Sequence, residues 1–295
     1  MLSNDLIQII IIFVLVGISV GFISSFFGVG ASFIMAPIMM ICFEIYLNTL
    51  PSISPLISFG TNMSIVIPTA ISGTYKHIKE LKKENIEFPL KHYTNFAIPV
   101  GFGSLTGTIL VYSLFLNFRD YTGFILKILY GLFCIISSYK YVKTKIKPKN
   151  FLPKIYKKKS YILGYSSGLI AHFIGIGGGL FYLSILNTIL EIPIQIATLL
   201  SLSTMIIGSS IGFSMFLVFG YHDYMINSSE YPPFTIGWFN YLAFLCIGIP
   251  SLIFAQIGPI LANKISPKKF KILIVCLYII IGIWLIFNGL YYIFL

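Results

Sequence analysis

Charged side chains are scarce in this chain: 10% of its 295 residues are charged, whereas 57% are hydrophobic and the mean hydropathy is +0.92. A soluble domain of this size needs a more polar surface, so the composition excludes an ordinary cytosolic protein and indicates one embedded in a lipid bilayer. The alternating pattern of barrel strands is also absent, which leaves α-helices as the spanning elements. Apolar runs of about 20 residues follow one another, each long enough to cross about 30 Å of hydrocarbon.

Several chemical motifs are missing as well. The 4 cysteines stand singly with no Cys-x-x-Cys pair, which argues against a disulfide framework and a zinc site. No glycine motif carries the Gly-Lys-Ser/Thr of a phosphate-binding P-loop, and the first apolar stretch, 6–27, lacks a cleavage signal and is interpreted as mature protein. The net charge of +11 comes from lysines in a few connections, so it predicts topology and not nucleic-acid binding. We expect no cofactor and no metal.

A segment of the sequence is repeated. Residues Gly21–Phe33 read GFISSFFGVGASF and Gly168–Leu180 read GLIAHFIGIGGGL, so that the second copy begins 147 residues after the first. Such a repeat within apolar sequence is typical of transporters built from inverted repeats. Each half contains five apolar segments, namely 5–29, 31–44, 55–75, 94–116 and 121–141, then 160–176, 178–190, 195–220, 236–262 and 270–294. We therefore predict an all-α polytopic membrane protein with two inverted-topology repeats, 1–141 and 160–295, joined by a basic linker, 142–159.

The lysines indicate how the two halves are inserted. They concentrate in a loop expected after the third segment and in the central linker, and the positive-inside rule places both in the cytoplasm. The corresponding connection of the second half, 221–235, holds Asp223 and Glu230 but no Lys or Arg. The halves are therefore predicted to insert oppositely into the cell inner (plasma) membrane, with both termini non-cytoplasmic. The lysines of the first expected loop are Lys76, Lys79, Lys82, Lys83 and Lys91.

The second segment of each half is short. Ala31–Phe43 would form about 20 Å of helix, which is less than the bilayer core of about 30 Å. Such a segment either crosses with a tilt or forms half of a re-entrant hairpin. The total is therefore about 8 to 10 crossings, and the choice does not change whether each half has an odd number.

Glycines indicate a break in the backbone of each repeat. Gly28, Gly30 and the run Gly175–Gly179 lie where one apolar segment ends and the next begins, with no polar loop between. The helix after such a break starts with unpaired N–H groups and the positive end of its dipole, and both favour an anion. Glycine also allows positive φ and close approach of a ligand. Close helix packing is the alternative use of such residues, but the duplication before a short helix favours the anion site.

These motifs resemble a known family. The glycine motif is followed by Phe33-Ile-Met-Ala-Pro37 and Ser58-Phe-Gly-Thr-Asn62, which are similar to patterns of the TauE/SafE family of sulfite and organosulfur-anion exporters. The resemblance covers most of the chain, although Ser184 stands where the second copy would have the proline. It implies a membrane transporter with inverted repeats, and commonly a small sulfur-containing anion as cargo.

Neutral polar residues complete the predicted substrate site. Thr61, Asn62 and Ser201 could donate hydrogen bonds that replace the hydration of an anion. His172 lies within the second motif, where an ionisable group is costly enough to suggest a function. The candidate substrate-binding residues are Gly28, Gly30, Ala31, Ser32, Thr61, Asn62, His172, Gly175, Gly177, Gly178, Gly179 and Ser201. Three other residues receive structural interpretations: Glu44 and Glu191 as boundary residues at opposite faces, and Trp238 as an interfacial anchor.

Together these features predict a permease that moves a small anion, sulfite or a related sulfur-containing anion, by alternating access at a midplane site. One half would rock against the other. One alternative is a permease for a sulfur-free organic acid or a metal ion, and another is an intramembrane thiol or lipid enzyme. The cysteines and His172 have no spacing that would activate a nucleophile, so we expect no enzymatic activity. A coupling proton or sodium ion is compatible with this function, but no residue cluster identifies one, and the sequence leaves the oligomeric state open.

Overall fold

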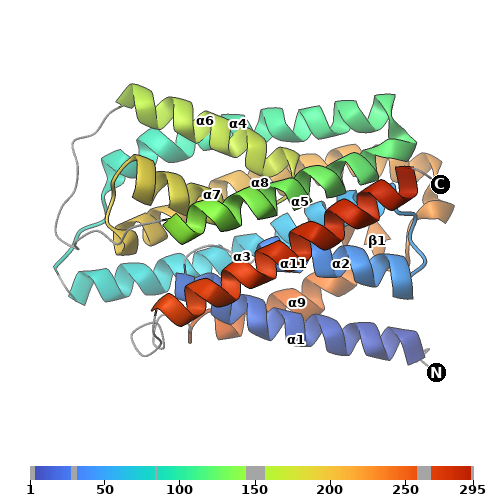
Figure 1. Cartoon of the computed structure of the whole chain (residues 1–295), viewed down its shortest axis with the longest axis horizontal. Coiled ribbons are helices and arrows are strands. Elements are labelled where there is room, and N and C mark those ends of the chain that lie inside the picture. Colours follow the sequence, from blue (N-terminus) through green and yellow to red (C-terminus); the bar gives the residue numbers. More distant parts are fainter. Residues whose placement is uncertain (1–3, 28–31, 84, 144–156, 258–266, 294–295) are drawn as a thin grey trace.

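The computed structural model describes residues 4–27, 32–83, 85–143, 157–257 and 267–293. In these ranges the chain is mostly helical, and its helices lie roughly along one common axis (Figure 1). A two-stranded antiparallel ribbon, β1 (Thr235–Ile236) and β2 (Phe239–Asn240), precedes one of the helices. The helices are α1 (Asn4–Phe27), α2 (Ser32–Tyr46), α3 (Ser54–Lys83), α4 (Leu90–Asn117), α5 (Arg119–Lys143), α6 (Lys157–Phe173), α7 (Gly179–Ser184), η1 (Ile185–Ile189), α8 (Ile194–Ile226), η2 (Ser228–Glu230), α9 (Tyr241–Phe254) and α11 (Pro267–Ile293).

Four of the described helices are long and apolar enough to cross a membrane. They are Leu6–Ser24 within α1, and the whole of α3, α4 and α8. Shorter apolar helices occupy Ile34–Tyr46, Tyr241–Phe254 and Ile279–Tyr291. Large apolar side chains such as Phe102 and Phe287 remain exposed on the helices, as expected where lipid and not water surrounds them. An all-helical membrane protein, as predicted, is therefore consistent with the fold.

The lysines expected in a loop after the third segment belong to a helix instead, so this prediction is wrong. The last turns of α3 contain Lys76, Lys79, Lys82 and Lys83. A polar helix can continue beyond the apolar span where its side chains find partners, and Glu80 Oε1 lies 3.7 Å from Lys76 Nζ and 2.9 Å from Lys83 Nζ. The connection expected from residue 221 is also shorter than predicted, because α8 continues to Ile226.

The helices pack in pairs that cross between the two halves of the sequence. The pairs are α1 with α9, α4 with α6, α3 with α8, and α5 with α11. The further contacts α1–α2, α2–α3 and α3–α9 define a first bundle of α1, α2, α3 and α9. The contacts α4–α8, α6–α7 and α7–α8 define a second bundle of α4, α6, α7 and α8. Each bundle thus combines three helices of one half with the fourth helix of the other.

Glycines allow the closest of these helix contacts. A Cβ added to Gly21 of α1 would lie 2.3 Å from the carbonyl oxygen of Ser251 in α9. A Cβ added to Gly168 of α6 would likewise lie 2.3 Å from the carbonyl oxygen of Val100 in α4. Gly21 and Gly168 begin the two copies of the repeated motif. Corresponding glycines therefore allow a close helix contact within each bundle, α1 on α9 in the first and α6 on α4 in the second.

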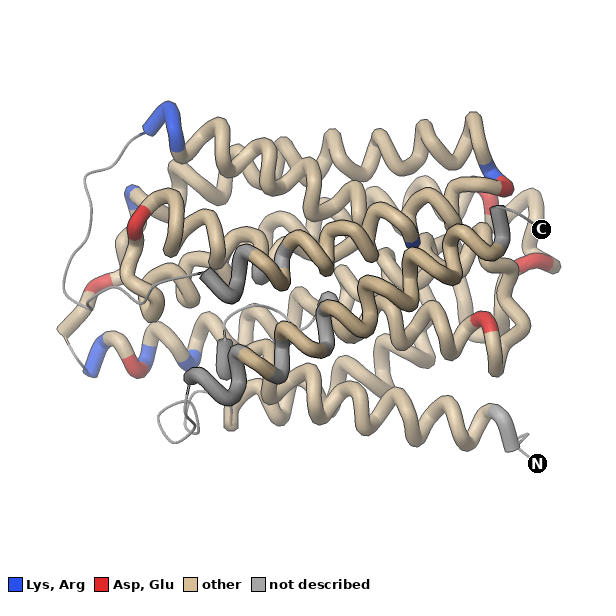
Figure 2. Tube along the Cα trace, in the orientation of Figure 1, with Lys and Arg blue, Asp and Glu red and all other residues tan. Residues whose placement is uncertain are grey.

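The two ends of the molecule differ in charge. Lysines gather at the end where α3 terminates and α6 begins (Figure 2). The first turn of α1 and the last turn of α11 lie at the opposite end, and α5 and α11 run side by side in opposite directions (Figure 1). Helices α1 and α6 therefore start at opposite ends of the molecule, although they contain the two copies of one motif.

The short second segment of each half returns along the helix before it. Lys159 Nζ, in the first turn of α6, donates a hydrogen bond to the Ile189 carbonyl at the end of η1, at 3.1 Å. Figure 1 shows α7 running back toward the start of α6. In the first half, the Phe13 ring of α1 packs edge-on against Phe43 of α2, with centroids 6.0 Å apart. In the second half, α6 and α7 thus form a helical hairpin with the glycine motif at its tip, and in the first half α2 packs beside α1.

Candidate functional site

The second glycine motif interrupts the helix as predicted. Helix α6 ends at Phe173, α7 begins at Gly179, and the residues between them are not helical. Gly175, Gly177 and Gly178 have φ values of +69°, +68° and +90°, which lie in the region that only glycine adopts readily. The corresponding residues of the first motif, Gly28, Gly30 and Ala31, lie outside the described part of the chain.

Two predicted site residues hold this loop in place. Asn62 Nδ2 of α3 donates a hydrogen bond to the Gly175 carbonyl at 2.8 Å, and Ser201 Oγ of α8 donates one to the Gly179 carbonyl at 2.9 Å. The structure therefore brings both residues to the second motif from different halves of the chain. Because these donors are already used on backbone carbonyls, we interpret Asn62 and Ser201 as supports of the loop and not as direct ligands.

Two buried hydroxyl groups face the loop at Gly177. A Cβ added to Gly177 would lie 3.4 Å from Ser32 Oγ and 3.5 Å from Ser209 Oγ, both ordinary van der Waals distances. Ser32 and Ser209 are fully buried, and neither hydroxyl has a hydrogen-bond partner among the described residues. A buried hydroxyl without a partner costs free energy, so such groups are expected where a ligand supplies the missing bond. Ser32 is the first described residue of α2.

More polar groups surround Gly208 of α8, one residue before Ser209. A Cβ added there would lie 2.9 Å from His172 Cε1, 3.1 Å from Ser104 Oγ and 3.2 Å from the Tyr182 hydroxyl. The Tyr182 hydroxyl is buried and has no hydrogen-bond partner within the described ranges. Side chains from α4, α6 and α7 therefore converge on the segment of α8 that contains Ser209.

His172 is fully buried at the end of α6. Its Nδ1 lies 2.9 Å from the Gly168 carbonyl, and because a carbonyl can only accept, Nδ1 carries the hydrogen. The His172 ring packs against α8 at Gly212, where there is no side chain. A Cβ added to Gly212 would lie 2.5 Å from His172 Cδ2. The predicted position of His172 beside the glycine loop is therefore observed.

Thr61 and Trp238 have different surroundings from those expected. Thr61 Oγ1 accepts a hydrogen bond from the Asn240 backbone N–H at 2.9 Å, so Thr61 fastens the β1–β2 ribbon to α3. The Trp238 side chain of this ribbon is fully buried, with its ring 5.2 Å from Phe115 and 5.6 Å from Phe216 between centroids. The interpretation of Trp238 as an interfacial anchor is therefore wrong, because the ribbon folds inward and aromatic rings cover it.

The sequence analysis missed Ser104, Tyr182 and Ser209. Ser209 lies in Gly208-Ser-Ser-Ile-Gly212, a group of small residues in an apolar helix, which is a recognised sign of close helix approach. That signal could have drawn attention to Ser209. Tyr182 and Ser104 carry no comparable local signal, because their proximity depends on how α4, α7 and α8 pack.

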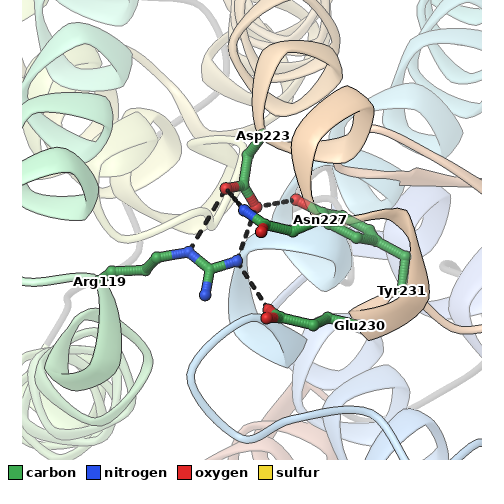
Figure 3. A network of polar contacts seen from close by, with 5 residues as sticks. All are labelled: Arg119, Asp223, Asn227, Glu230 and Tyr231. Carbon is green, nitrogen blue, oxygen red and sulfur yellow. Dashed lines mark hydrogen bonds and ion pairs between the residues drawn. The ribbon is translucent and has the colours of Figure 1, made fainter.

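A polar network connects Arg119 with side chains at and beyond the end of α8 (Figure 3). Arg119, the single arginine of the chain, donates to Glu230 at 2.7 Å and to Asp223 at 3.2 Å. Asp223 also accepts hydrogen bonds from Asn227 at 2.9 Å and from the Tyr231 hydroxyl at 2.7 Å. Burial alone would lower the pKa of Arg119, but the hydrogen bonds to Glu230 and Asp223 raise it by more, so the guanidinium stays charged. The network ties the start of α5 to the end of α8.

Glu44 lies in the last turn of α2, near the end of that helix at Tyr46. Its side chain is 11% exposed, and its Oε1 forms an ion pair with Lys127 Nζ of α5. This ion pair adds a contact that the sequence did not indicate, because Lys127 lies far away along the chain. Glu191, the equivalent residue of the second repeat, is exposed.

Among the described residues, no three His, Cys, Asp or Glu side chains gather in a way that could hold a metal ion. Cys42 and Cys134 are buried, Cys246 is partly buried and Cys276 is exposed, and all four thiols are free. Polar groups around the glycine loop are hydroxyls, an amide and an imidazole. Such groups can bind a small solute through hydrogen bonds.

The interrupted helix, the buried polar groups around it and the apolar helices define a polytopic membrane transporter. The model of the family "Sulfite exporter TauE/SafE" matches residues 13–285, so the chain belongs to the TauE/SafE family. A protein of Methanocaldococcus jannaschii named as a probable membrane transporter is 27% identical over 280 residues, covering 92% of this chain and 94% of that protein. A Bacillus subtilis protein with the same description is 21% identical over 303 residues, covering 95% and 98%. No solved structure matches the chain.

Proposed function

We propose that this protein is a permease that moves a small anion, sulfite or a related sulfur-containing anion, across the cell membrane by alternating access. The observation that carries the proposal is the pair of buried hydroxyls of Ser32 and Ser209 beside the positive-φ loop at Gly177, neither of which has a hydrogen-bond partner among the described residues. A solute with several acceptor oxygens could receive hydrogen bonds from both. Membership in the family supports transport, and its description supports sulfite as the cargo. We assign no enzymatic reaction.

The start of α2 would add to the attraction for an anion. The first N–H groups of a helix have no intrahelical partner, and its dipole is positive at that end. Ser32 is the first residue of α2 and contributes its hydroxyl at the same point. Neutral donors can hold an anion without trapping it as a full positive charge would, which suits a site that must also release its cargo.

The two halves would form inverted repeats. Support comes from α1 and α6, which hold the two copies of the motif yet start at opposite ends of the molecule (Figure 1). The positive-inside rule would place the lysine-rich end, with the linker 142–159, in the cytoplasm (Figure 2). Both termini would then be non-cytoplasmic, and the glycine loops would meet near the midplane.

The two bundles, and not the two sequence halves, would be the moving bodies of alternating access. The first bundle contributes Ser32 and Asn62, while the second contributes the Gly175–Gly178 loop and Ser209. The site thus lies between the bundles, where α3 meets α8. A rocking motion at this boundary would open the site to one side and then to the other.

The test is anion flux in proteoliposomes that contain the full-length protein. Uptake of radiolabelled sulfite, thiosulfate and sulfate is compared with uptake by protein-free liposomes. We expect protein-dependent uptake of at least one of them, which saturates and is inhibited by an excess of the unlabelled anion. If none of the three anions is transported, and a divalent cation or a sulfur-free organic acid is, then the proposal is wrong.

A further inference from the structure

An ion pair is buried between α2 and α5, outside the site described above. The Lys127 side chain is fully buried, and its Nζ lies 2.6 Å from Glu44 Oε1. Asn288 of α11 accepts a second hydrogen bond from Lys127 Nζ at 2.8 Å. Buried charges within a membrane protein are costly even when paired, and they commonly mark an ion or proton pathway. Neither residue belongs to the candidate substrate site.

The ion pair is connected to the substrate site through both ends of α2. Tyr130 lies about one turn beyond Lys127 on α5, and its hydroxyl donates to the Ser32 carbonyl at 3.1 Å. Helix α5 therefore holds the first residue of α2 through Tyr130 and its last turns through Lys127 and Glu44. Because Ser32 faces Gly177, a change of charge at Glu44 can shift the helix start that faces the anion.

Among the described residues, Glu44, which is distant in the sequence, forms an ion pair with Lys127 at 2.6 Å, and other groups lie on α5 and on the helices that contact it. From α5 itself, the Phe124 ring lies 6.0 Å from Lys127 Nζ. Helices α3 and α4 also contact α5. Their acidic and basic residues lie at the end of the molecule away from this ion pair. Tyr112 of α4 is a further titratable group, and its ring stacks on Phe219. The first turn of α5 contains Asp120, and α11 contributes the exposed Tyr291 beyond Asn288.

The balance of charge indicates which ligand such a group would bind. The paired ammonium and carboxylate have no net charge, and one added proton would give the group a charge of +1. A positive charge in a medium of low dielectric attracts an anion nearby. Thermodynamic linkage then requires that the bound anion raise the affinity for the proton by the same factor. Proton and anion would therefore bind cooperatively and cross together.

We propose that Glu44 and Lys127 form the coupling-proton site of the transporter, so that each anion is accompanied by one proton. This inference depends on the proposed anion transport. The Glu44 carboxylate accepts the proton and becomes neutral, and its ion pair with Lys127 is lost. Lys127 stays protonated and keeps its hydrogen bond to Asn288. Release of the proton on the other side of the membrane restores the pair.

The experiment compares two modes of flux in proteoliposomes with wild-type protein and with the double variant Glu44→Gln/Lys127→Gln. The probes are radiolabelled thiosulfate and sulfate, neither of which carries a proton near neutral pH. Exchange is measured at equal pH on both sides, and accumulation is measured with the outside more acidic by one pH unit. The membrane potential is clamped to zero. At one proton per anion, the pH gradient alone then supports about tenfold accumulation. The wild type is expected to accumulate the anion, whereas the variant, which lacks the positive charge of the protonated pair, should exchange it more slowly and without accumulation.

Two further measurements make the result decisive. Glu80→Gln removes an exposed carboxylate that pairs with Lys76 and Lys83, and this control is expected to accumulate the anion like the wild type. A pH-sensitive dye inside wild-type vesicles should report one proton entering with each anion, which tests the proposal even if the double variant does not fold. Accumulation that persists in the double variant, or anion entry without protons in the wild type, overturns the coupling site but leaves anion transport standing. If the wild type exchanges no anion at all, both proposals fail.

Discussion

At the scale of single residues, the three positive-φ glycines of the loop differ in the space beside them. A Cβ on Gly175 would lie 2.0 Å from the Phe59 ring, and one on Gly178 would lie 2.0 Å from the Tyr182 ring. At Gly177 the nearest atom, Ser32 Oγ, would be 3.4 Å away. A methyl group therefore fits only at Gly177, where it would stand among the hydroxyls proposed to bind the anion.

Gly177→Ala should impair transport much more than it impairs folding. The left-handed backbone costs an alanine about 1–2 kcal/mol, whereas the methyl group would occupy the anion's place and reduce flux about tenfold or more. Flux in proteoliposomes and thermal unfolding in detergent measure the two effects. The control is Gly248→Ala in α9, where a Cβ would have no neighbour closer than 3.9 Å and flux should not change. Normal flux in Gly177→Ala would argue against the site.

Ser209→Ala should weaken anion binding without destabilising the protein. The Ser209 hydroxyl has no partner among the described residues, so its removal loses no internal hydrogen bond. A hydrogen bond to a charged ligand contributes about 1.5–3 kcal/mol, so the dissociation constant should rise about tenfold to a hundredfold. Equilibrium binding of the radiolabelled anion measures this change. Ser214→Ala is the matched control, since the exposed Ser214 hydroxyl bonds the Ser210 carbonyl of its own helix.

At the scale of the elements, the β1–β2 ribbon gives Thr61 a structural role. Thr61→Val keeps the shape of the side chain but leaves the buried Asn240 N–H without its acceptor. We expect the free energy of unfolding to fall by about 1–3 kcal/mol and the anion affinity to stay within about twofold. Chemical denaturation and anion binding test the two parts. A large loss of affinity with unchanged stability would return Thr61 to the list of ligands.

The elements themselves were largely predictable from the sequence, because runs of apolar residues mark the spans directly. Predicted and observed bounds of α1, α4 and α5 differ by only a few residues, whereas α3 extends further because its polar end remains helical. The partners of Lys127 and Ser209 were not predictable. Lys127 lies in an ordinary apolar segment, and its burial depends on Glu44 and Asn288, which come from distant parts of the chain. Local patterns define helices, but the site depends on how the helices pack.

At the scale of the whole molecule, the packing of the bundles distinguishes two forms of alternating access. If the sequence halves moved as units, α1 would slide on α9 and α4 on α6, which would separate glycine contacts as close as that between Gly21 and Ser251. If the bundles move, these contacts persist and the boundary between α3 and α8 changes. The α5–α11 pair can follow either bundle, since Lys127 joins it to α2 and Arg119 joins it to α8.

Two disulfide cross-links should separate these mechanisms in a protein whose native cysteines are replaced and whose flux is retained. Thr69→Cys/Ser251→Cys joins α3 to α9 within the first bundle, where the two hydroxyls lie 3.0 Å apart. Gly73→Cys/Leu202→Cys joins α3 to α8 between the bundles, where a Cβ on Gly73 would lie 3.2 Å from Leu202 Cδ1. We expect oxidation to leave flux within about twofold in the first variant and to block it reversibly in the second, because only the second link spans the moving boundary. If oxidation blocks flux in both variants, the sequence halves move as units, since each link joins one half to the other.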